Sequence, residues 1–444
     1  MIPAARLSAA IEVLDDLITR RRPASDALKD WGLAHRFAGS GDRAAISALV
    51  YDTLRRRASA CYLMGADTSR AMLLGALLLE RGQSPDEIAA LCSGDRFAPE
   101  PLTADELAAL KSNRLDTASA HIVGDYPEWL DGSFKEAFGD QRGVELKALA
   151  HRAPVDLRVN SLKATRERVL EELHHLNVTA TPHSMMGVRI LPSLDGRAPS
   201  VQAEPAFQKG LYEIQDEGSQ LAATLCAVDP GMQVIDLCAG AGGKTLALAA
   251  LMDNRGQVFA TDSDKRRLAP IFDRLTRAAA RNVQVRAPKT KEDEPLKGLE
   301  GQADLVVIDA PCTGTGTWRR NPDAKWRLRP NALEDRIKEQ RLVLERAAPF
   351  VKRGGTLAYI TCSLLPQEND EAIETFLASH ESFTLIEPEH VASQAGLPAL
   401  APFVSAKGKG LQLTPARTGT DGFFIALLKK HLRTDTDLID DHTA

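Results

Sequence analysis

Residues 233–252 read QVIDLCAGAGGKTLALAALM, an apolar strand that enters an apolar helix through a glycine-rich loop. Strand-like segments follow at 257–262, 282–286 and 303–310, and another at 354–363 comes after a long amphipathic helical pattern. Buried strands that alternate with helices are typical of a doubly wound, Rossmann-like α/β sheet. Ligands bind such a sheet at the carboxyl ends of its strands, which predicts a binding site at the glycine-rich loop.

The rest of the chain differs in pattern from this α/β domain. The first part has apolar residues at helical spacing, such as Leu7, Ile11, Leu14 and Ile18, without a competing strand pattern. A middle part has two strand-like segments around one helical pattern. We therefore predict an all-α domain at 1–140, a small α+β connecting segment at 141–212, the α/β domain at 213–431 and a disordered acidic tail at 432–444.

The composition of the 444 residues is that of a globular protein with more than one domain, since 44% are hydrophobic and 26% are charged. No apolar run is long enough to cross a bilayer, and the N-terminus lacks the order of regions of a signal peptide. This predicts a cytoplasmic protein without a membrane partner. None of the six cysteines forms a C-x-x-C pair, so we expect neither a disulfide framework nor a metal site.

The loop ends in Gly243-Lys244-Thr245, as does the phosphate-binding loop of nucleoside triphosphatases. That loop requires the pattern G-x-x-x-x-G-K-[ST], because its first glycine lets the backbone wrap around the phosphates. Here the first position is Cys238, and Asp236 on the preceding strand would repel a triphosphate. An ATPase with magnesium-dependent turnover is therefore the third of our interpretations.

A site for S-adenosylmethionine fits the same residues better. Its sulfonium and ammonium groups are cationic, so an acid beside the loop is favourable rather than harmful. The small residues from Ala239 to Gly243 allow close approach of the backbone. Asp262, at the end of the next strand, is placed to bind ribose hydroxyls. Either acid alone also fits a solvated strand end, but their joint spacing favours the cofactor.

Two cysteines follow neighbouring strands of the predicted sheet, Cys312 in IDAPCTGTG and Cys362 in YITCS. Their thiols should therefore face one pocket beside the methyl donor. A single strand-end cysteine is more often a small buried hydrophobic residue. A thiolate beside a methyl donor suits methylation of a pyrimidine at C5, because addition of sulfur to C6 makes C5 nucleophilic. Asp309 is placed to hydrogen-bond the base at N3 and N4, and Lys244 is a candidate to lower a thiol pKa.

The segments that carry these residues resemble those of a known family. CAGAGGKT (238–245), DAPCTGTGTWRRNPD (309–323) and TCSLLPQEN (361–369) are similar to the signature segments of the RsmB-like (Sun) RNA cytosine-5 methyltransferases. GDRAAISALVYDTLRRR (41–57), LRVNSLK (157–163) and FQKGLYEIQDEGSQL (207–221) resemble bacterial members. The resemblance implies a NusB-like helical RNA-binding domain followed by a Rossmann-like S-adenosylmethionine-dependent methyltransferase domain.

The resemblance also implies roles for individual residues. Cys362 becomes the nucleophile, and Cys312 assists release of the methylated product. The cofactor or the target base is held by the loop and two acids, which are Cys238, Ala239, Gly240, Ala241, Gly242, Gly243, Lys244, Asp262 and Asp309. The chain departs from the family where Gly240 and Ala241 replace Ala-Pro, which gives the loop more backbone freedom. After the third strand, the segment RAPKTKED (286–293) has no acid at the position expected for the adenine contact, and Asp293 lies too far along the chain, so that contact is not identified.

A basic window at 317–353 holds eleven Lys and Arg against five Asp and Glu, although the chain has a net charge of −5. We predict that this window contacts the RNA backbone. Its tryptophans and cations suit stacking on unpaired bases, and the residues concerned are Trp318, Arg319, Arg320, Lys325 and Arg327. The candidates in the helical domain are Lys29, His35, Arg36, Arg43 and Arg55 to Arg57. The alternative to RNA contact is that one tryptophan belongs to the core and the arginines form a solvated helix face.

The combined prediction is a monomeric enzyme that methylates C5 of a cytosine in small-subunit ribosomal RNA. Within the same chemistry, another RNA such as tRNA is an alternative substrate. A non-catalytic RNA-binding factor of ribosome assembly is an alternative from another class, and the presence of both Cys312 and Cys362 weighs against it.

Overall fold

The computed structural model describes residues 1–112, 114–193, 199–290 and 293–432, so the predicted tail lies outside the described residues from 433 onward. The chain forms two compact units. Within the described part of the chain, the first comprises 1–153, 192–193 and 317–329, and the second comprises 154–191, 199–316 and the chain from 330. Among the described residues, none of the helices combines the length and the apolar character that a membrane crossing requires.

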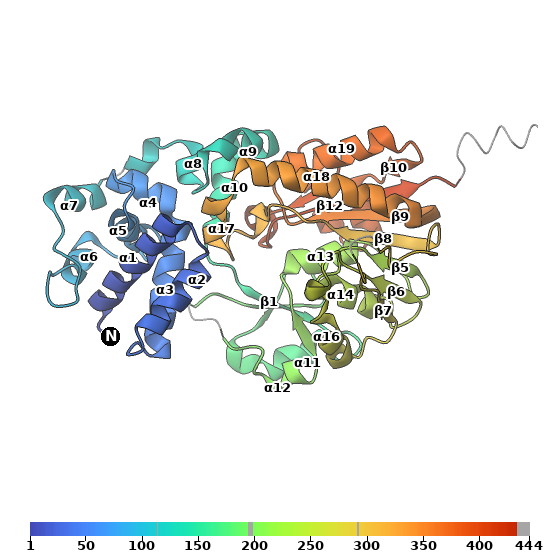
Figure 1. Ribbon diagram of the computed structural model, residues 1–444, viewed down its shortest axis with the longest axis horizontal. Coiled ribbons are helices and arrows are strands. Elements are labelled where there is room, and N and C mark those ends of the chain that lie inside the picture. The colour runs from blue at the N-terminus through green and yellow to red at the C-terminus, as the bar shows by residue number, and fades with distance from the viewer. Residues whose placement is uncertain (113, 194–198, 291–292, 433–444) are drawn as a thin grey trace, which may run out of the picture. The chain divides into compact units, whose positions relative to one another are not determined.

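The first unit is helical (Figure 1). Its apolar core includes Leu7 and Leu14, two helical turns apart on one helix, together with Ile46 and Leu74 from two others. The helices from the N-terminal part of the chain are α1 (Pro3–Arg20), α2 (Ala24–Ala34), α3 (Ser40–Arg55), α4 (Arg57–Met64), α5 (Ser69–Leu79), α6 (Pro85–Leu91), α7 (Ala104–Leu110), α8 (Ala120–Val123), α9 (Asp131–Phe138) and α10 (Arg142–Leu149).

The segment 317–329, which contains α17 (Pro322–Arg327), also belongs to this helical unit. The Trp318 ring meets Phe134 of α9 edge to face at 6.0 Å between centroids. The indole Nε1 of Trp326 donates a hydrogen bond to the Leu54 carbonyl at 2.7 Å. The Asp323 carboxylate accepts one from the backbone N–H of Ala24 at 3.2 Å. A short piece of chain from the α/β part of the sequence is thus an integral element of the helical unit.

The second unit contains a small antiparallel sheet of order β2-β3-β1-β4. Its strands are β1 (Val155–Val159), β2 (Thr179–Ala180), β3 (Gly187–Ile190) and β4 (Tyr212–Ile214), and its helices are α11 (Arg166–Glu172) and α12 (Pro205–Gln208). Leu157, Val159, Val188 and Tyr212 pack with Val169 of α11 into a separate core. These strands and helices lie between residues 155 and 214, whereas the sequence predicts an α+β segment at 141–212; residues 141–153 belong to the helical unit.

The main sheet of the second unit has the order β10-β12-β9-β8-β5-β6-β7, with β11 paired to β12. Strands β5 to β9 are parallel, and β12 runs antiparallel to β9. They are β5 (Gln233–Asp236), β6 (Gln257–Ala260), β7 (Val283–Val285), β8 (Ala303–Asp309), β9 (Val351–Thr361), β10 (Phe383–Leu385), β11 (Leu411–Leu413) and β12 (Phe423–Lys430). The predicted α/β fold is confirmed.

Helices cover both faces of this sheet (Figure 1). Along β8, Val306 and Ile308 point into a core that α18 and α19 cover, whereas Leu305 and Val307 point into one that α13 and α14 cover. Burial on both faces explains why β8 reads as a continuous apolar run. The helices are α13 (Glu217–Leu225), α14 (Gly243–Leu251), α15 (Lys265–Leu268), α16 (Ile271–Ala278), α18 (Pro330–Ala347), α19 (Asp370–Ser379), α20 (Pro388–Gln394) and α21 (Pro415–Thr418).

Candidate active site

Two cysteines lie side by side where the adjacent parallel strands β8 and β9 end. The last pair of the ladder is Asp309 with Ile360, so Cys362 follows β9 directly and Cys312 follows β8 by three residues. Their sulfurs are 3.4 Å apart. Both side chains are partly buried and neither forms a disulfide. Strand neighbourhood thus brings together two thiols that are fifty positions apart in the sequence.

The environment of Cys312 favours its neutral form. The hydrogen bond with Cys362, burial, and the charges of Cys362 and Glu368 raise the pKa of the Cys312 thiol well above its usual value. At neutral pH this residue therefore carries its proton and can donate it in a hydrogen bond to the sulfur of Cys362.

The two cysteine-bearing loops are joined by short hydrogen bonds. The Gly316 backbone N–H donates to the Cys362 carbonyl at 2.9 Å, and the Leu364 N–H donates to the Thr315 hydroxyl at 2.8 Å. A Cβ at Gly316 would lie 2.2 Å from the Gly422 carbonyl oxygen, so only glycine fits there. These hydrogen bonds hold the backbones of the two loops in place relative to each other, and thereby the positions of the two thiols.

The glycine-rich loop needs glycine at two positions. Gly240 and Gly242 have φ of +51° and +85°, in the left-handed region that a side chain disfavours. A Cβ on Gly242 would also lie 2.5 Å from Ile271. The Ala239 N–H donates to the Thr261 carbonyl at 2.9 Å, which attaches the loop to the end of β6. The loop then enters α14 at Gly243.

Asp262 lies beside this loop at the end of β6. Its Oδ2 accepts a hydrogen bond from the Gly240 N–H at 3.0 Å, and its Oδ1 accepts one from the Asp264 N–H at the same distance. The guanidinium of Arg267 is 3.5 Å away. Asp262 is thus next to Gly240, as the spacing predicts for an acid that meets the ribose of a nucleoside cofactor.

Asp236 supports the loop from beneath. Its side chain is completely buried, and its Oδ2 accepts a hydrogen bond from the Thr245 hydroxyl at 2.7 Å, while its Oδ1 has no partner. Burial raises the pKa of the Asp236 carboxyl to about 7. The side chain is therefore not fully ionised at neutral pH, unlike the acid assumed from the sequence.

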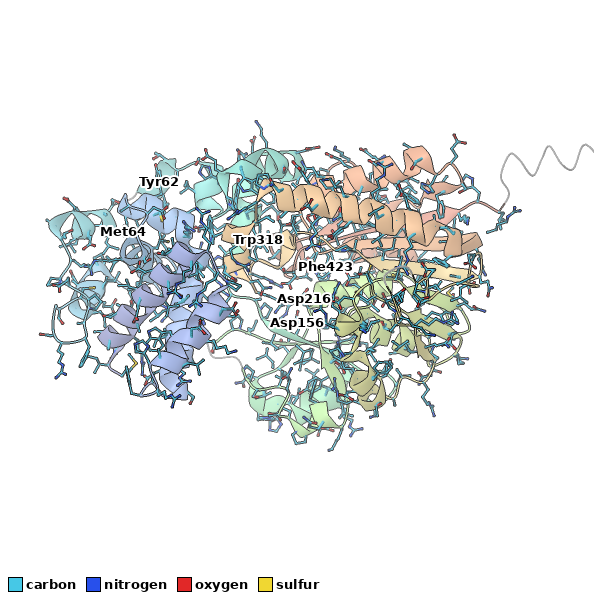
Figure 2. All side chains as sticks on the ribbon, in the orientation of Figure 1. Tyr62, Met64, Asp156, Asp216, Trp318 and Phe423 are labelled. Atoms are coloured by element: carbon cyan, nitrogen blue, oxygen red, sulfur yellow. The ribbon has the colours of Figure 1, made fainter. Side chains whose placement is uncertain are left out.

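Lys244 pairs with Asp309 across the site. The Lys244 Nζ is 2.8 Å from the Asp309 Oδ2, donates to the Ser219 hydroxyl at 3.2 Å, and lies 5.1 Å from the centre of the Phe423 ring (Figure 2 labels Phe423). Lys244 is buried, whereas 38% of the Asp309 side chain is exposed. The ammonium of Lys244 is thus paired with a carboxylate, and Asp309 remains open on one side to a ligand.

A hydrogen-bonded chain that sequence reasoning did not identify reaches this ion pair from the small antiparallel sheet. Arg158 of β1 donates to the Gln215 Oε1 at 2.5 Å, and the Gln215 Nε2 donates to Ser219 at 3.0 Å. The same Arg158 nitrogen donates to the Gly243 carbonyl at 2.7 Å. Burial lowers the pKa of Arg158 to about 10. Arg158 and Gln215 lie in the segments 157–163 and 207–221, which resemble bacterial members of the family. No chemical pattern in either segment predicts that Arg158 contacts Gln215 and Gly243.

The second sheet-to-loop contact comes from α16. Arg274 donates to the Ala241 carbonyl at 2.7 Å and forms an ion pair with Glu213 of β4 at 2.9 Å. At the start of α13, Asp156 and Asp216 accept hydrogen bonds from the backbone N–H groups of Glu217 and Gly218 at 3.0 and 2.8 Å (Figure 2). The small sheet is thus connected to the loop at Gly243 through Arg158 and at Ala241 through Glu213 and Arg274, and to the start of α13 through Asp156.

The Asp293 carboxylate accepts a hydrogen bond at Oδ2 from the Lys289 N–H at 2.9 Å. After β7 comes Arg286, whose guanidinium lies 4.8 Å from the centre of the Phe259 ring. Among the described residues, no group of His, Cys, Asp and Glu is arranged to hold a metal ion.

The structure contradicts surface roles for three of the predicted RNA contacts. Trp318, Arg319 and Lys325 are only 1%, 5% and 2% exposed. The reason is that 317–329 packs within the helical unit, where the Lys325 Nζ donates to the Arg55 carbonyl at 3.3 Å. Arg320 is half-buried and Arg327 is exposed. These two remain candidates for RNA contact.

The basic candidates of the helical domain divide in the same way. Lys29, Arg36 and Arg43 are exposed, and His35 is half-buried. Arg55 and Arg56 are buried, where Arg56 pairs with Glu80 at 2.8 Å. Buried charges need a partner inside the protein, so Arg55 and Arg56 are interpreted as residues that stabilise the interior of the helical unit.

Comparison with known proteins places these features in a family context. A family model for the 16S rRNA methyltransferase RsmB/F matches residues 223–429, and a model for the RsmF/B-like methyltransferase ferredoxin-like domain matches residues 126–194. The chain is 34% identical over 309 residues to a probable ribosomal RNA small subunit methyltransferase B of Synechocystis, across 69% of this chain and 67% of that protein.

Other comparisons agree with this match. The ribosomal RNA small subunit methyltransferase B of Yersinia enterocolitica is 33% identical over 69% of this chain and 66% of its own length. The crystal structure of PH0851 superposes with a TM-score of 0.68 at 26% identity and covers 97% of this chain and 99% of that one. A methyltransferase homologue from Pyrococcus horikoshii has a TM-score of 0.56 at 26% identity, over 70% of this chain and 97% of that one.

Proposed function

Because this chain belongs to the 16S rRNA methyltransferase RsmB/F family, whose cofactor is S-adenosylmethionine, we propose that it methylates C5 of a cytosine in small-subunit ribosomal RNA through a covalent adduct between Cys362 and C6. The observation that carries this proposal is the pair of thiols 3.4 Å apart at the ends of β8 and β9. Two adjacent thiols have no use in phosphate transfer, but each has a task in a reaction that forms and then breaks a carbon–sulfur bond.

The proposed steps conserve atoms and protons. The Cys362 thiolate adds to C6 of the cytosine, which turns C5 into an enamine-like carbon. S-adenosylmethionine, when bound, would supply the methyl group to C5: its methyl–sulfonium bond would break as the C5–methyl bond forms, and the thioether S-adenosylhomocysteine would be the leaving group. Loss of the C5 proton to a base and cleavage of the C6–S bond restore the aromatic ring and return the Cys362 thiolate. This sequence divides one difficult substitution into easier steps.

We assign to Cys312 the stabilisation of the departing thiolate. A thiol whose pKa is raised keeps its proton at neutral pH and can donate a hydrogen bond to the sulfur of Cys362 as the C6–S bond breaks. Removal of Cys312 should therefore slow release more than attack.

The loop and its acids fit a nucleoside cofactor. The two left-handed glycines leave the loop backbone uncovered by side chains, and Asp262 contacts Gly240 at the end of β6. The Thr261 hydroxyl beside it is buried without a partner. These groups would hold the ribose and the methionine part of S-adenosylmethionine. Asp309, fixed by Lys244, would hydrogen-bond the target base at N3 and N4.

The alternatives predict different outcomes. A tRNA methyltransferase would use the same residues on another RNA, and mapping of the modified cytosine decides between the two. A non-catalytic assembly factor would bind RNA without needing either thiol. The two thiols lie within hydrogen-bonding distance of each other, which favours the enzyme over the assembly factor.

The test uses the full-length protein and tritiated S-adenosylmethionine with a mixture of small-subunit ribosomal RNA and tRNA. Cys362→Ala should abolish methyl transfer and leave cofactor binding unchanged. Cys312→Ala should accumulate a protein–RNA adduct that survives denaturing electrophoresis, and bisulfite sequencing should locate the methylated cytosine. Full turnover by the Cys362 variant, or label recovered only in tRNA, would overturn the corresponding part of the proposal.

A further inference from the structure

One buried glutamate connects the two loops that carry the cysteines. Glu368 lies in the turn Pro366–Glu368 after β9, and its side chain has no exposed surface. The backbone N–H and the hydroxyl of Thr313 donate to its two carboxylate oxygens at 2.8 and 2.5 Å. The Ser363 hydroxyl donates to the same carboxylate. Thr313 follows Cys312 and Ser363 follows Cys362, so a single carboxylate holds the neighbours of both thiols.

A further residue completes this arrangement. The Gln340 Nε2 of α18 donates to the Glu368 Oε1 at 3.0 Å and to the Pro311 carbonyl at 2.9 Å. Glu368 thus receives four hydrogen bonds, which offset the cost of its burial. Gln340 holds the Pro311 carbonyl, and Glu368 holds Thr313. The residues on both sides of Cys312 are therefore fixed by groups that converge on the Glu368 carboxylate.

Asn369 gives the Cys362 loop a support that does not depend on Glu368. Asn369 accepts a hydrogen bond from the Thr361 hydroxyl at 2.6 Å and donates one to the Ser363 carbonyl at 3.0 Å. It therefore binds the residues on both sides of Cys362. Loss of the Glu368 side chain would remove the two hydrogen bonds that Thr313 donates to it, whereas the Cys362 loop would keep its contacts with Asn369.

We propose that Glu368 is a positioning residue that holds the Cys312 thiol against the sulfur of Cys362, so that release of the product follows attack. This inference rests on the proposed function, because it assigns a purpose to the closeness of the two thiols. Its charge contributes in the same direction, since Glu368 is one of the groups that raise the pKa of Cys312. The carboxylate therefore favours both the position and the protonation of the releasing thiol.

A first experiment measures the distance between the thiols without RNA or cofactor. Diamide oxidises two adjacent thiols to a disulfide, and it is reduced to its hydrazine in the process. The rate of Cys312–Cys362 disulfide formation should fall at least tenfold in Glu368→Ala. Glu368→Gln has the same shape and can exchange hydrogen bonds with the same hydroxyls, so it should stay within about twofold of the wild type. An unchanged rate in Glu368→Ala, or an equal loss in both variants, overturns the proposal.

A second experiment tests the coupling to catalysis. Glu368→Ala should lower kcat, leave the KM for S-adenosylmethionine unchanged and accumulate the covalent RNA adduct, as Cys312→Ala does. Glu371→Ala is the matched control, because this glutamate of α19 pairs with Lys407 at 3.1 Å on the surface, and it should leave both assays unchanged. If Glu368→Ala does not fold, Thr313→Val removes a single hydroxyl donor and should slow disulfide formation two- to fivefold.

The two proposals fail in distinguishable ways. An adduct in Cys312→Ala but not in Glu368→Ala contradicts the positioning role of Glu368 alone. The absence of an adduct in both variants contradicts the proposed covalent function, whereas the disulfide rates still report whether Glu368 positions the thiols.

Discussion

The ammonium of Lys244, in the first turn of α14, lies 2.8 Å from the carboxylate of Asp309, the last residue of β8. The lysine is buried against Phe423, while the carboxylate is open on one side. A pair with this asymmetry holds its exposed member in a fixed orientation and leaves it free to meet a ligand. The ion pair with Lys244 therefore fixes the orientation of the Asp309 carboxylate toward a ligand.

The first prediction concerns this pair. Lys244→Met and Asp309→Asn should each lower the single-turnover rate of methyl transfer at least tenfold. The first variant removes the ion pair that orients Asp309, and the second weakens the hydrogen bond of its carboxylate to the base. The double variant should be no slower than the slower single variant, which corresponds to a coupling of about 1 kcal/mol or more. Rates that multiply independently in the double variant would show that the two residues act separately.

The second prediction concerns Arg158, which supports the loop from the small antiparallel sheet. Arg158→Leu removes the donor to the Gly243 carbonyl and to Gln215, so the dissociation constant for S-adenosylmethionine should rise about tenfold, or about 1.4 kcal/mol. The measurement is isothermal titration calorimetry. Arg168→Leu, at an exposed ion pair of α11, is the control and should bind as the wild type does. Equal affinities of the two variants would remove Arg158 from the support of the loop.

The sheet and the loop were predictable because each depends on a local pattern. Apolar runs such as 303–309 predict strands, and the glycines at 240 and 242 indicate a backbone that a Cβ would obstruct. The strand order then places Cys312 and Cys362 together, since both follow adjacent parallel strands. Periodicity and chain order were sufficient for these features.

The buried charges were not predictable, because their partners are distant in sequence. Lys325 looks like a surface residue of a basic segment, yet it meets the Arg55 carbonyl 270 positions away. Arg158 meets Gly243 across 85 positions, and Glu368 meets Thr313 across 55. No window of sequence shows that a charged side chain has such a partner, so the default expectation of exposure is wrong for these residues.

The third prediction separates a buried cation from an exposed one in the basic segment. Lys325→Ala leaves Asp125 buried without this neighbour and should cost about 3 kcal/mol of stability, with little effect on the salt dependence of RNA binding. Arg327→Ala should keep the wild-type stability and reduce the slope of log K against log salt by roughly 0.7 to 0.9. Thermal unfolding and RNA titrations at several salt concentrations measure both. A flattened salt slope in a fully stable Lys325→Ala protein would restore Lys325 as an RNA contact.

The fourth prediction uses the raised pKa of Asp236. Burial raises this pKa from 3.8 to about 7, so between these values the folded protein keeps a proton that the unfolded chain has lost. Within this window, each rise in pH therefore destabilises the folded state, by about 1.4 kcal/mol per unit and roughly 4 kcal/mol in total. Asp236→Asn cannot ionise, and its oxygen can still accept the hydrogen bond from Thr245. Its stability relative to the wild type should therefore increase by up to that amount from about pH 4 to about pH 8.

Asp264→Asn provides a control of opposite sign for this last measurement. The hydrogen bonds from Arg266 lower the pKa of Asp264, so this acid stabilises the folded protein above its unfolded pKa and loses that contribution as the pH falls. Asp264→Asn should accordingly be less stable than the wild type at neutral pH, and the deficit should vanish in acid. Urea unfolding of the three proteins from about pH 2 to about pH 8 gives both differences, because the Asp264 contribution is lost below the unfolded pKa of 3.8 and the Asp236 contribution changes between 3.8 and about 7. A stability difference for Asp236→Asn that does not change with pH would mean that Asp236 is already ionised in the folded protein, and its place beneath the loop would then require a compensating cation.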